Sequence, residues 1–179
     1  DDSVGVVDLM KKLVVKRISV GTRPSFLALS DNGKTLVVSN YGSHNVSVID
    51  TDRLDVVSTI VVDANPLGVA ISRDQRFAFV ANYHGQSVSQ IDLTTMALVR
   101  RHSVAPHPYG VVVRRQGGEL LVTHADSPIV SFWARGRWTR IAIRDGATSV
   151  ALGRDGMLVY LAGFPAHRLS IFRGRARQK

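Results

Sequence analysis

Cysteine is absent from this 179-residue chain, which excludes disulfide bonds, thiolate metal sites and cysteine nucleophiles. No apolar run reaches the roughly 18–20 residues that a membrane-spanning helix needs, so no span is expected. Glutamate occurs only once, at Glu119, which leaves little material for catalysis by paired carboxylates. The signatures G-x-S-x-G, H-E-x-x-H, G-x-G-x-x-G and the P-loop are also missing. The sequence therefore names no common enzyme class.

The composition is that of a folded globular protein, with 45% hydrophobic and 21% charged residues. The chain begins Asp1-Asp2-Ser3, without an initiator methionine or a signal peptide, and is expected to be a processed product or a piece of a longer protein. Its lack of cysteine is compatible with the periplasm, the cell surface or the cytosol.

Positive charge is concentrated in the second half of the chain. Residues 1–97 hold 9 Lys/Arg against 10 Asp/Glu, whereas residues 98–179 hold 14 against 4, within an overall net charge of +9. This asymmetry suits a polyanion or an acidic partner, but the favoured explanation is that exposed strand and turn positions carry arginine.

The strongest pattern is a repeat of 42 residues. The segment Val46-Ser47-Val48-Ile49-Asp50 returns as Val88-Ser89-Gln90-Ile91-Asp92. Weaker copies begin one period earlier at Val4 and one period later at Val130. A period of this length indicates stacked or radially arranged units, none of which buries its apolar face alone.

Each repeat is expected to form four short strands, which in one unit cover residues 67–71, 77–82, 88–92 and 98–104. The second strand is apolar on both faces, so the sheet must be covered on both sides. The fourth, with Arg100, Arg101 and His102, is more polar, as an outer edge should be. The sequence predicts an all-β chain: a β-propeller of four-stranded antiparallel blades, with about four repeats.

The predicted boundaries follow the repeat. They are a partial blade at 1–20, blades at 21–62, 63–104 and 105–143, a partial blade at 144–173, and a basic tail at 174–179.

Two segments carry a family resemblance: Val38-Ser39-Asn40-Tyr41, which leads through a Gly/Ser loop into Val46–Asp50, and Val80-Ala81-Asn82-Tyr83. They resemble the YVTN family of β-propeller repeats, and Pro66–Ala70 and Pro108–Val112 look like its innermost strand. The resemblance covers nearly the whole chain and is strongest over 20–113. It implies a propeller of about seven blades and a periplasmic or cell-surface location.

The predicted strands do not add up to a whole number of blades, because the chain both enters and leaves at a third strand. Three arrangements remain open: a compact four-bladed ring, half of a two-chain ring, or part of a longer propeller. An unclosed ring would expose an apolar sheet face and an unpaired edge, so closure by a partner chain or by further sequence is favoured.

Candidate ligand-binding residues lie in the loops between second and third strands and in those that enter each innermost strand. Both sets emerge on one face of a propeller. They are His44, His84, His107, His124, Asp126 and Arg23. A face rich in histidine and carboxylate suits a divalent metal or a tetrapyrrole iron, although loop histidines also commonly bond backbone, and no cofactor is predicted. His124 is notable because Asn40 and Asn82 occupy its position in the preceding repeats.

Other repeated residues are interpreted as structural. Asn40 and Asn82 are expected to bond neighbouring loop amides, and Asp50 and Asp92 to accept Asx-turn hydrogen bonds. Trp133 and Trp138 flank a predicted hairpin turn, across which they are expected to pack.

Three function hypotheses follow. The first is a non-enzymatic module that binds a protein, a second copy of the chain or a small ligand over its loop-rich face. The second is a cofactor-binding or hydrolytic propeller with a His-lined site, similar to haem d1, amine dehydrogenase or lactonase propellers. The third is polyanion binding through the Arg-rich half, with candidate residues Arg100, Arg101, Arg173, Arg175 and Arg177. Nucleic acid is not the expected polyanion, because this region lacks interleaved aromatic residues.

Overall fold

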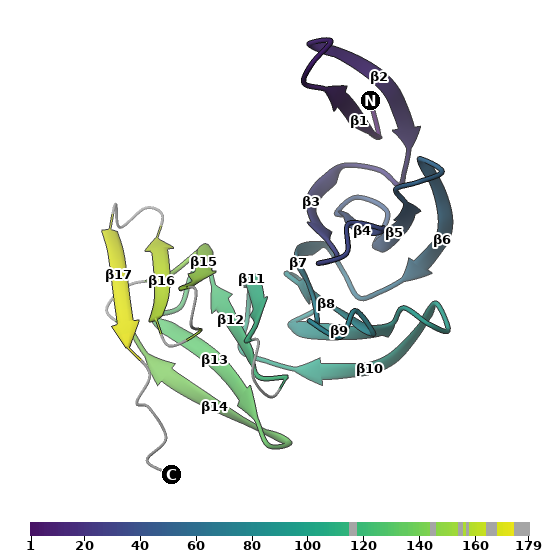
Figure 1. The fold of residues 1–179 in the computed structure, drawn as a ribbon. Coiled ribbons are helices and arrows are strands. Elements are labelled where there is room, and N and C mark those ends of the chain that lie inside the picture. The colour runs from purple at the N-terminus through teal and green to yellow at the C-terminus, as the bar shows by residue number, and fades with distance from the viewer. Residues whose placement is uncertain (115–117, 144–145, 154–155, 157, 164–167, 174–179) are drawn as a thin grey trace.

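The computed structural model describes residues 1–114, 118–143, 146–153, 156, 158–163 and 168–173. Every regular element in these ranges is a β-strand, and the strands form five antiparallel sheets (Figure 1). Three sheets have four strands each, one has two, and one has three. The predicted all-β propeller architecture is therefore confirmed.

The strands follow the chain in simple up-and-down order within each sheet. The first sheet is β1 (Ser3–Asp8) and β2 (Leu13–Ser19). The three complete blades are β3 (Pro24–Leu29), β4 (Thr35–Asn40), β5 (Asn45–Asp50) and β6 (Asp55–Val61); β7 (Pro66–Ile71), β8 (Phe77–Asn82), β9 (Ser87–Asp92) and β10 (Ala97–Ser103); and β11 (Pro108–Val113), β12 (Leu120–His124), β13 (Ile129–Ala134) and β14 (Arg137–Ala142). The last sheet is β15 (Ser149–Leu152), β16 (Leu158–Gly163) and β17 (Arg168–Arg173).

Aspartates end β1, β5 and β9 and organise the turns that follow. Asp50 Oδ1 accepts hydrogen bonds of 2.9 and 3.0 Å from the amides two and three residues later. Asp92 Oδ1 does the same at 2.8 and 3.2 Å, and Asp8 Oδ1 at 2.9 Å to both amides. The predicted Asx turns are confirmed at Asp50 and Asp92.

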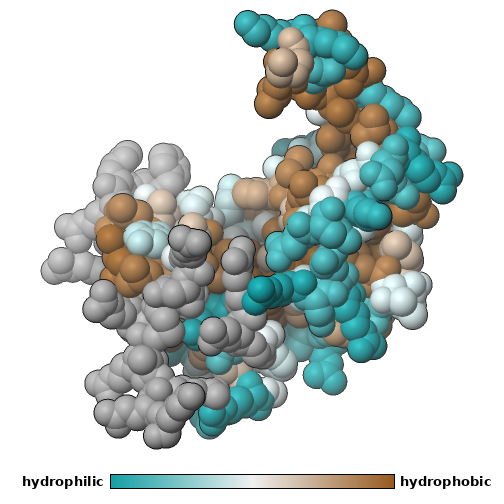
Figure 2. Space-filling view, in the orientation of Figure 1, coloured by the Kyte–Doolittle hydropathy of each residue, from teal (hydrophilic) through white to brown (hydrophobic). Residues whose placement is uncertain are grey.

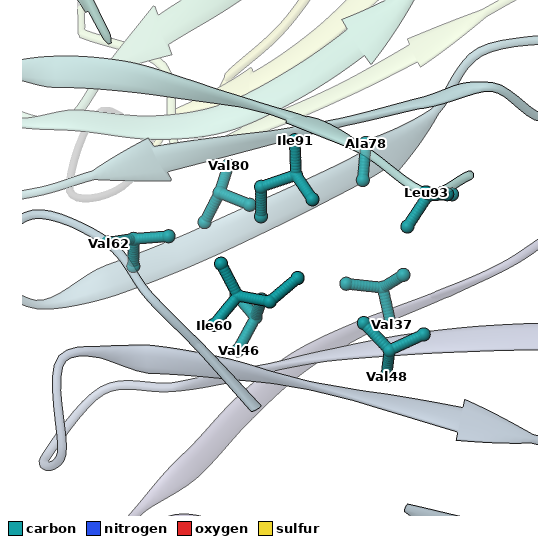
Figure 3. Close-up of a cluster of buried hydrophobic side chains, with 9 residues drawn as sticks. All are labelled: Val37, Val46, Val48, Ile60, Val62, Ala78, Val80, Ile91 and Leu93. Atoms are coloured by element: carbon teal, nitrogen blue, oxygen red, sulfur yellow. The ribbon is translucent and has the colours of Figure 1, made fainter. Parts of the chain in front are cut away.

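The apolar cores lie between neighbouring blades. Side chains of β4, β5 and β6 face those of β8 and β9, as Figure 3 shows for Val46, Val80 and Ile91. On β8, Ala78 and Val80 point into this cluster, while Phe79 and Ala81 point into the next one. Each central strand is thus buried on both faces, as its apolar sequence predicts.

The outermost strand β10 is less exposed to solvent than its polar sequence suggests. Its arginines are exposed, but His102 is buried and lies edge-on to Trp133 and Trp138 of the next blade. These two tryptophans are register partners in the β13–β14 hairpin. The expectation of a uniformly polar edge was wrong at His102, because the Trp pair of the neighbouring blade covers the imidazole.

The innermost strands approach one another closely. A Cβ on Gly68 of β7 would come within 2.5 Å of the Tyr109 carbonyl oxygen and 2.9 Å of the Gly110 Cα on β11. Side-chain-free backbone at this point is what lets β7 and β11 touch.

The blades follow one another along an arc, with the β1–β2 hairpin and the sheet of β15–β17 at its opposite ends (Figure 1). Among the described residues, β1 and β2 pair only with each other, and β15–β17 form a separate sheet. Apolar surface extends from the N-terminal hairpin along the inner side of the arc (Figure 2). In the described residues the two end sheets are thus not paired with each other into one blade. In the described part of the chain, no helix is long and apolar enough to cross a membrane.

Candidate functional site

Five side chains from two adjacent blades meet on the face where the loops enter the innermost strands. Tyr83 and His84 lie in the β8–β9 loop, His107 precedes β11, Tyr109 lies on β11, and Asp126 lies in the β12–β13 loop. We call these five residues the loop-face cluster. It contains three of the six predicted ligand-binding residues.

The centre of the cluster is a stacked pair of rings bridged by a carboxylate. The Tyr83 and His107 rings stack with centroids 4.7 Å apart and planes 16° apart. Asp126 Oδ2 lies 2.9 Å from His107 Nδ1 and accepts a 3.2 Å hydrogen bond from the Tyr83 hydroxyl. One carboxylate of the third complete blade therefore holds a ring from each of two blades.

The cluster changes the acidity of the phenol while staying open to water. Partial burial raises the pKa of Tyr83, and the hydrogen bond to Asp126, together with its charge, adds to this rise. The side chains of His107 and Asp126 remain 38% and 62% exposed. A polar contact this accessible stabilises the fold by about 1 kcal/mol at most, so its geometry matters more than its energy.

Asn65 connects two loop histidines, His44 and His84. His84 Nδ1 lies 2.8 Å from Asn65 Oδ1, and the Asn65 amide donates a 3.0 Å hydrogen bond to His44 Nδ1. The Asn65 side chain also donates to the Tyr41 carbonyl at 3.2 Å. His84 meets the Tyr83 ring edge-on at 4.8 Å. His44 is therefore linked to the cluster through Asn65, although it is not part of it.

Arg23, Asn65 and His107 occupy one repeat position, each directly before a proline. All three have a left-handed backbone, with φ of 53°, 57° and 54°. Because the repeats share this geometry, it belongs to the propeller turn and is not a local strain at the site. The Arg23 guanidinium lies over the Tyr41 ring, 4.9 Å from its centroid.

His124 lies in the interior of its blade. It is fully buried, its Nδ1 donates to the Pro106 carbonyl at 2.9 Å, and its Nε2 accepts from the Ser131 hydroxyl at 2.8 Å. Burial lowers the pKa of His124, and the Pro106 and Ala105 hydrogen bonds oppose this only partly. We therefore leave His124 out of the proposed ligand-binding set.

The equivalent asparagines donate to side-chain oxygens of their own blade and not to the expected loop amides. Asn82 Nδ2 donates to the Ser87 and Ser89 hydroxyls at 3.0 and 2.9 Å. Asn40 Nδ2 donates to Asn45 Oδ1 and to the Ser47 hydroxyl at 2.8 and 3.0 Å. The structural role expected for them is correct, but the expected partners were wrong, because the amides point across the strands of their own blade.

The candidate polyanion-binding residues do not form one described surface. Arg101 Nε donates to Asp63 Oδ1 at 2.8 Å, which offsets its charge, and Arg100 is exposed beside it on β10. Arg173 ends β17, and nothing further is described of it. Arg175 and Arg177 lie outside the described residues. In the described ranges, no group of three or more His, Cys, Asp or Glu side chains is placed to hold a metal ion.

Sequence reasoning missed the two tyrosines of the cluster. Tyr109 meets the Tyr83 ring edge-on at 6.4 Å and extends the aromatic surface toward the innermost strands. The repeat contained a usable signal, because Tyr83 stands 42 residues after Tyr41 and directly before the candidate His84. Both tyrosines belong to segments that the repeat already explains, Val80–Tyr83 and Pro108–Val112, so the sequence alone does not single them out as site residues.

Comparison with known families gives one match. A family model described as lactonase, 7-bladed beta-propeller, matches residues 14–121, which is more than half of the chain. No curated protein matches this sequence.

Solved structures resemble this chain in fold, at low identity. They include a hydrazine synthase of Kuenenia stuttgartiensis (23% identity, TM-score 0.77, covering 85% of this chain and 46% of that one). A dihydro-heme d1 dehydrogenase, NirN, in complex with DHE has 18% identity and a TM-score of 0.79, over 97% and 40% of the two chains. The Cps50 (Swd1) β-propeller domain of Myceliophteria thermophila has 15% identity and a TM-score of 0.75, over 89% and 54%. The chain spans about half the length of these structures.

Proposed function

Since the chain belongs to the lactonase family of seven-bladed β-propellers, we propose that its loop-face cluster binds a small, polar, ring-shaped ligand of the sugar-lactone kind. The observation that carries this proposal is that Tyr83, His107 and Asp126 of two blades are in mutual contact. The Tyr83 and His107 ring centroids are 4.7 Å apart, and His107 Nδ1 lies 2.9 Å from Asp126 Oδ2. Ligand sites combine apolar surface with a few fixed polar groups, and this cluster has both.

The chemistry of the cluster suits such a ligand. The edges and faces of Tyr83 and Tyr109 offer apolar surface to the C–H groups of a ring. Asp126 and His84 offer hydrogen-bonding groups to hydroxyls, and both are exposed. Because Asp126 already holds His107 and Tyr83 in place, little side-chain freedom remains to be lost on binding.

The specific observation behind a second candidate, lactone hydrolysis, is the His107–Asp126 contact. A carboxylate that holds Nδ1 orients an imidazole to act as a general base through Nε2. In that reaction His107 takes a proton from water, the water oxygen bonds to the lactone carbonyl carbon, and the ring C–O bond breaks. The ring oxygen then takes this proton from the His107 imidazolium, which yields the hydroxy acid and returns His107 to its starting state.

One experiment tests binding and turnover together. The probes are D-glucono-1,5-lactam, a stable analogue whose binding is followed by ligand-observed NMR, and D-glucono-1,5-lactone, whose hydrolysis is followed by acid release. We expect Tyr83→Ala to weaken lactam binding at least about tenfold, because it removes the ring on which the site is built. Tyr41→Ala is the matched control, since Tyr41 holds the same repeat position but lies under Arg23.

The outcomes separate the two candidates. Wild-type binding that Tyr83→Ala loses and Tyr41→Ala keeps supports the ligand site. Acid release above the spontaneous rate that falls about 100-fold or more in His107→Asn supports hydrolysis. Binding without acid release contradicts hydrolysis and leaves a binding module. No lactam binding by the wild-type protein overturns the proposed site.

We also propose that the incomplete end sheets pair with strands of a second copy of the chain. Apolar side chains are exposed at both ends of the arc, among them Leu13 and Val15 of β2, and Leu169 and Ile171 of β17. Exposed strand edges of this kind readily accept further strands. A native mass spectrum of the purified protein should show a dimer at micromolar concentration; a monomer across that range would contradict a second copy.

A further inference from the structure

Phe26 is an exception in the repeat of innermost strands. It stands 42 residues before Gly68 and 84 before Gly110, the glycines at the close approach of β7 and β11. On β3 the same position carries one of the largest side chains, and 37% of it is exposed. The inner side of the arc therefore receives a ring from this blade where the next two blades contribute only backbone.

The Phe26 ring reaches the loop-face cluster from two blades away. It meets the Tyr109 ring edge-on, with centroids 5.7 Å apart and planes 88° apart. Tyr109 in turn meets Tyr83 edge-on at 6.4 Å. A continuous series of aromatic rings thus runs from the innermost strand β3 through Tyr109 to the stacked Tyr83 and His107.

The backbone at Phe26 is held in place from a neighbouring strand. Its amide donates to the Ser39 hydroxyl at 3.1 Å, and the same hydroxyl lies 3.3 Å from the Phe26 carbonyl oxygen, to which it also donates. Thr123 holds Gly110 in the same way, at 2.9 and 3.4 Å. In these two blades a hydroxyl therefore fixes the backbone here whatever the side chain, whereas Ala81 has this position in the blade between them. In the first complete blade the fixed backbone aims a ring at Tyr109.

We propose that Phe26 is a specificity-determining residue that closes the inner side of the loop-face cluster and limits the ligand to a single ring. This inference rests on the proposed function of the cluster. A ring placed against Tyr109 takes up the space beside the innermost strands into which a second ligand ring would extend. Its exposed edge then forms an apolar wall against the bound ring.

The test compares a one-ring with a two-ring probe. D-glucono-1,5-lactam is the first, and its 4-O-β-D-glucosyl derivative is the second. We expect wild-type protein to prefer the one-ring probe at least tenfold, and Phe26→Gly to bring the ratio of the two Kd values close to one. Leu27→Gly is the matched control. It introduces the same glycine into the same strand, but the side chain that it removes lies on the opposite face of the sheet.

Each outcome distinguishes this inference from the function on which it rests. If Phe26→Gly binds the one-ring probe and still rejects the two-ring probe as wild-type protein does, Phe26 does not set ligand size, and the binding site itself stands. If wild-type protein binds neither probe, the proposed function fails and this inference with it. Should Phe26→Gly fail to fold, Phe26→Leu keeps an apolar side chain on β3 and allows the same comparison. Its ratio of the two Kd values should lie between that of the wild-type protein and one.

Discussion

Replacing Gly68 with alanine is expected to lower the free energy of unfolding by about 3 kcal/mol. The added Cβ would lie 2.5 Å from the Tyr109 carbonyl oxygen, 2.9 Å from the Gly110 Cα and 3.0 Å from the Val111 nitrogen. All three obstacles are backbone atoms of β11, so no side chain can rotate away. Relief requires β7 and β11 to separate, and that would disturb the core packed between their blades.

Urea unfolding followed by circular dichroism measures this effect. Gly5→Ala is the matched control, because Gly5 also lies in a strand, β1, and a Cβ there would meet nothing within 4 Å. Gly5→Ala should leave stability unchanged or raise it slightly, since it restricts the unfolded chain. Equal midpoints for the two variants would show that the inner strands have room to move apart.

Replacing His124 with leucine should destabilise the fold by about 2–4 kcal/mol, because the Pro106 carbonyl and the Ser131 hydroxyl would lose their buried partner. His124→Asn should cost less. Asn40 and Asn82 hold this position in the other two complete blades, where each bonds the serine equivalent to Ser131. The cost that remains is a small cavity, because asparagine is smaller than histidine.

His124→Asn should also reduce the dependence of the free energy of unfolding on pH. Burial lowers the pKa of His124 in the folded protein, so below its ordinary value of 6.5 the unfolded chain binds a proton that the folded chain does not. The free energy of unfolding therefore falls as the pH drops below about 6.5, by at most about 1.4 kcal/mol per pH unit for this group. Burial and the charge of Arg100 lower the pKa of His102, which acts in the same direction.

Urea unfolding at pH 7.5 and pH 5.5 separates the contributions of the two histidines. Wild-type protein should lose stability between these values, and His124→Asn should lose less, with the remainder due in part to His102. An equal loss in both proteins would mean that His124 is already protonated in the folded state or that its burial is relieved as the pH falls.

The fold could be predicted from the sequence because each repeat states the same pattern again. The strands of Val46–Asp50 and Val88–Asp92, the Asx turns after them and the doubly buried β8 all follow from local patterns that 42-residue spacing reinforces. His102 departed from this because its burial depends on Trp133 and Trp138, which belong to another blade. Contacts between blades leave no trace in the pattern of one repeat.

The candidate site was predictable only in part for the same reason. Placing His84, His107 and Asp126 on one face required only the order of strands in a blade. Recognising Tyr83 as their common neighbour required knowing that His107 of one blade stacks on the loop of the preceding one. His124 shows the reverse case, in which an unusual residue type drew attention to a position whose surroundings are entirely interior.

The left-handed residues before Pro24, Pro66 and Pro108 have a consequence for how such proteins diversify. Their backbone shape comes from the turn, so arginine, asparagine and histidine are carried there with nearly equal φ. Each blade thus presents one exchangeable side chain at this position of the loop face. A change of that side chain alters the chemistry of the loop face without changing the fold of the blade. A family built this way can acquire new ligands by one substitution at a time at this position. In protein engineering, Arg23, Asn65 and His107 can be exchanged in combination on an unchanged scaffold.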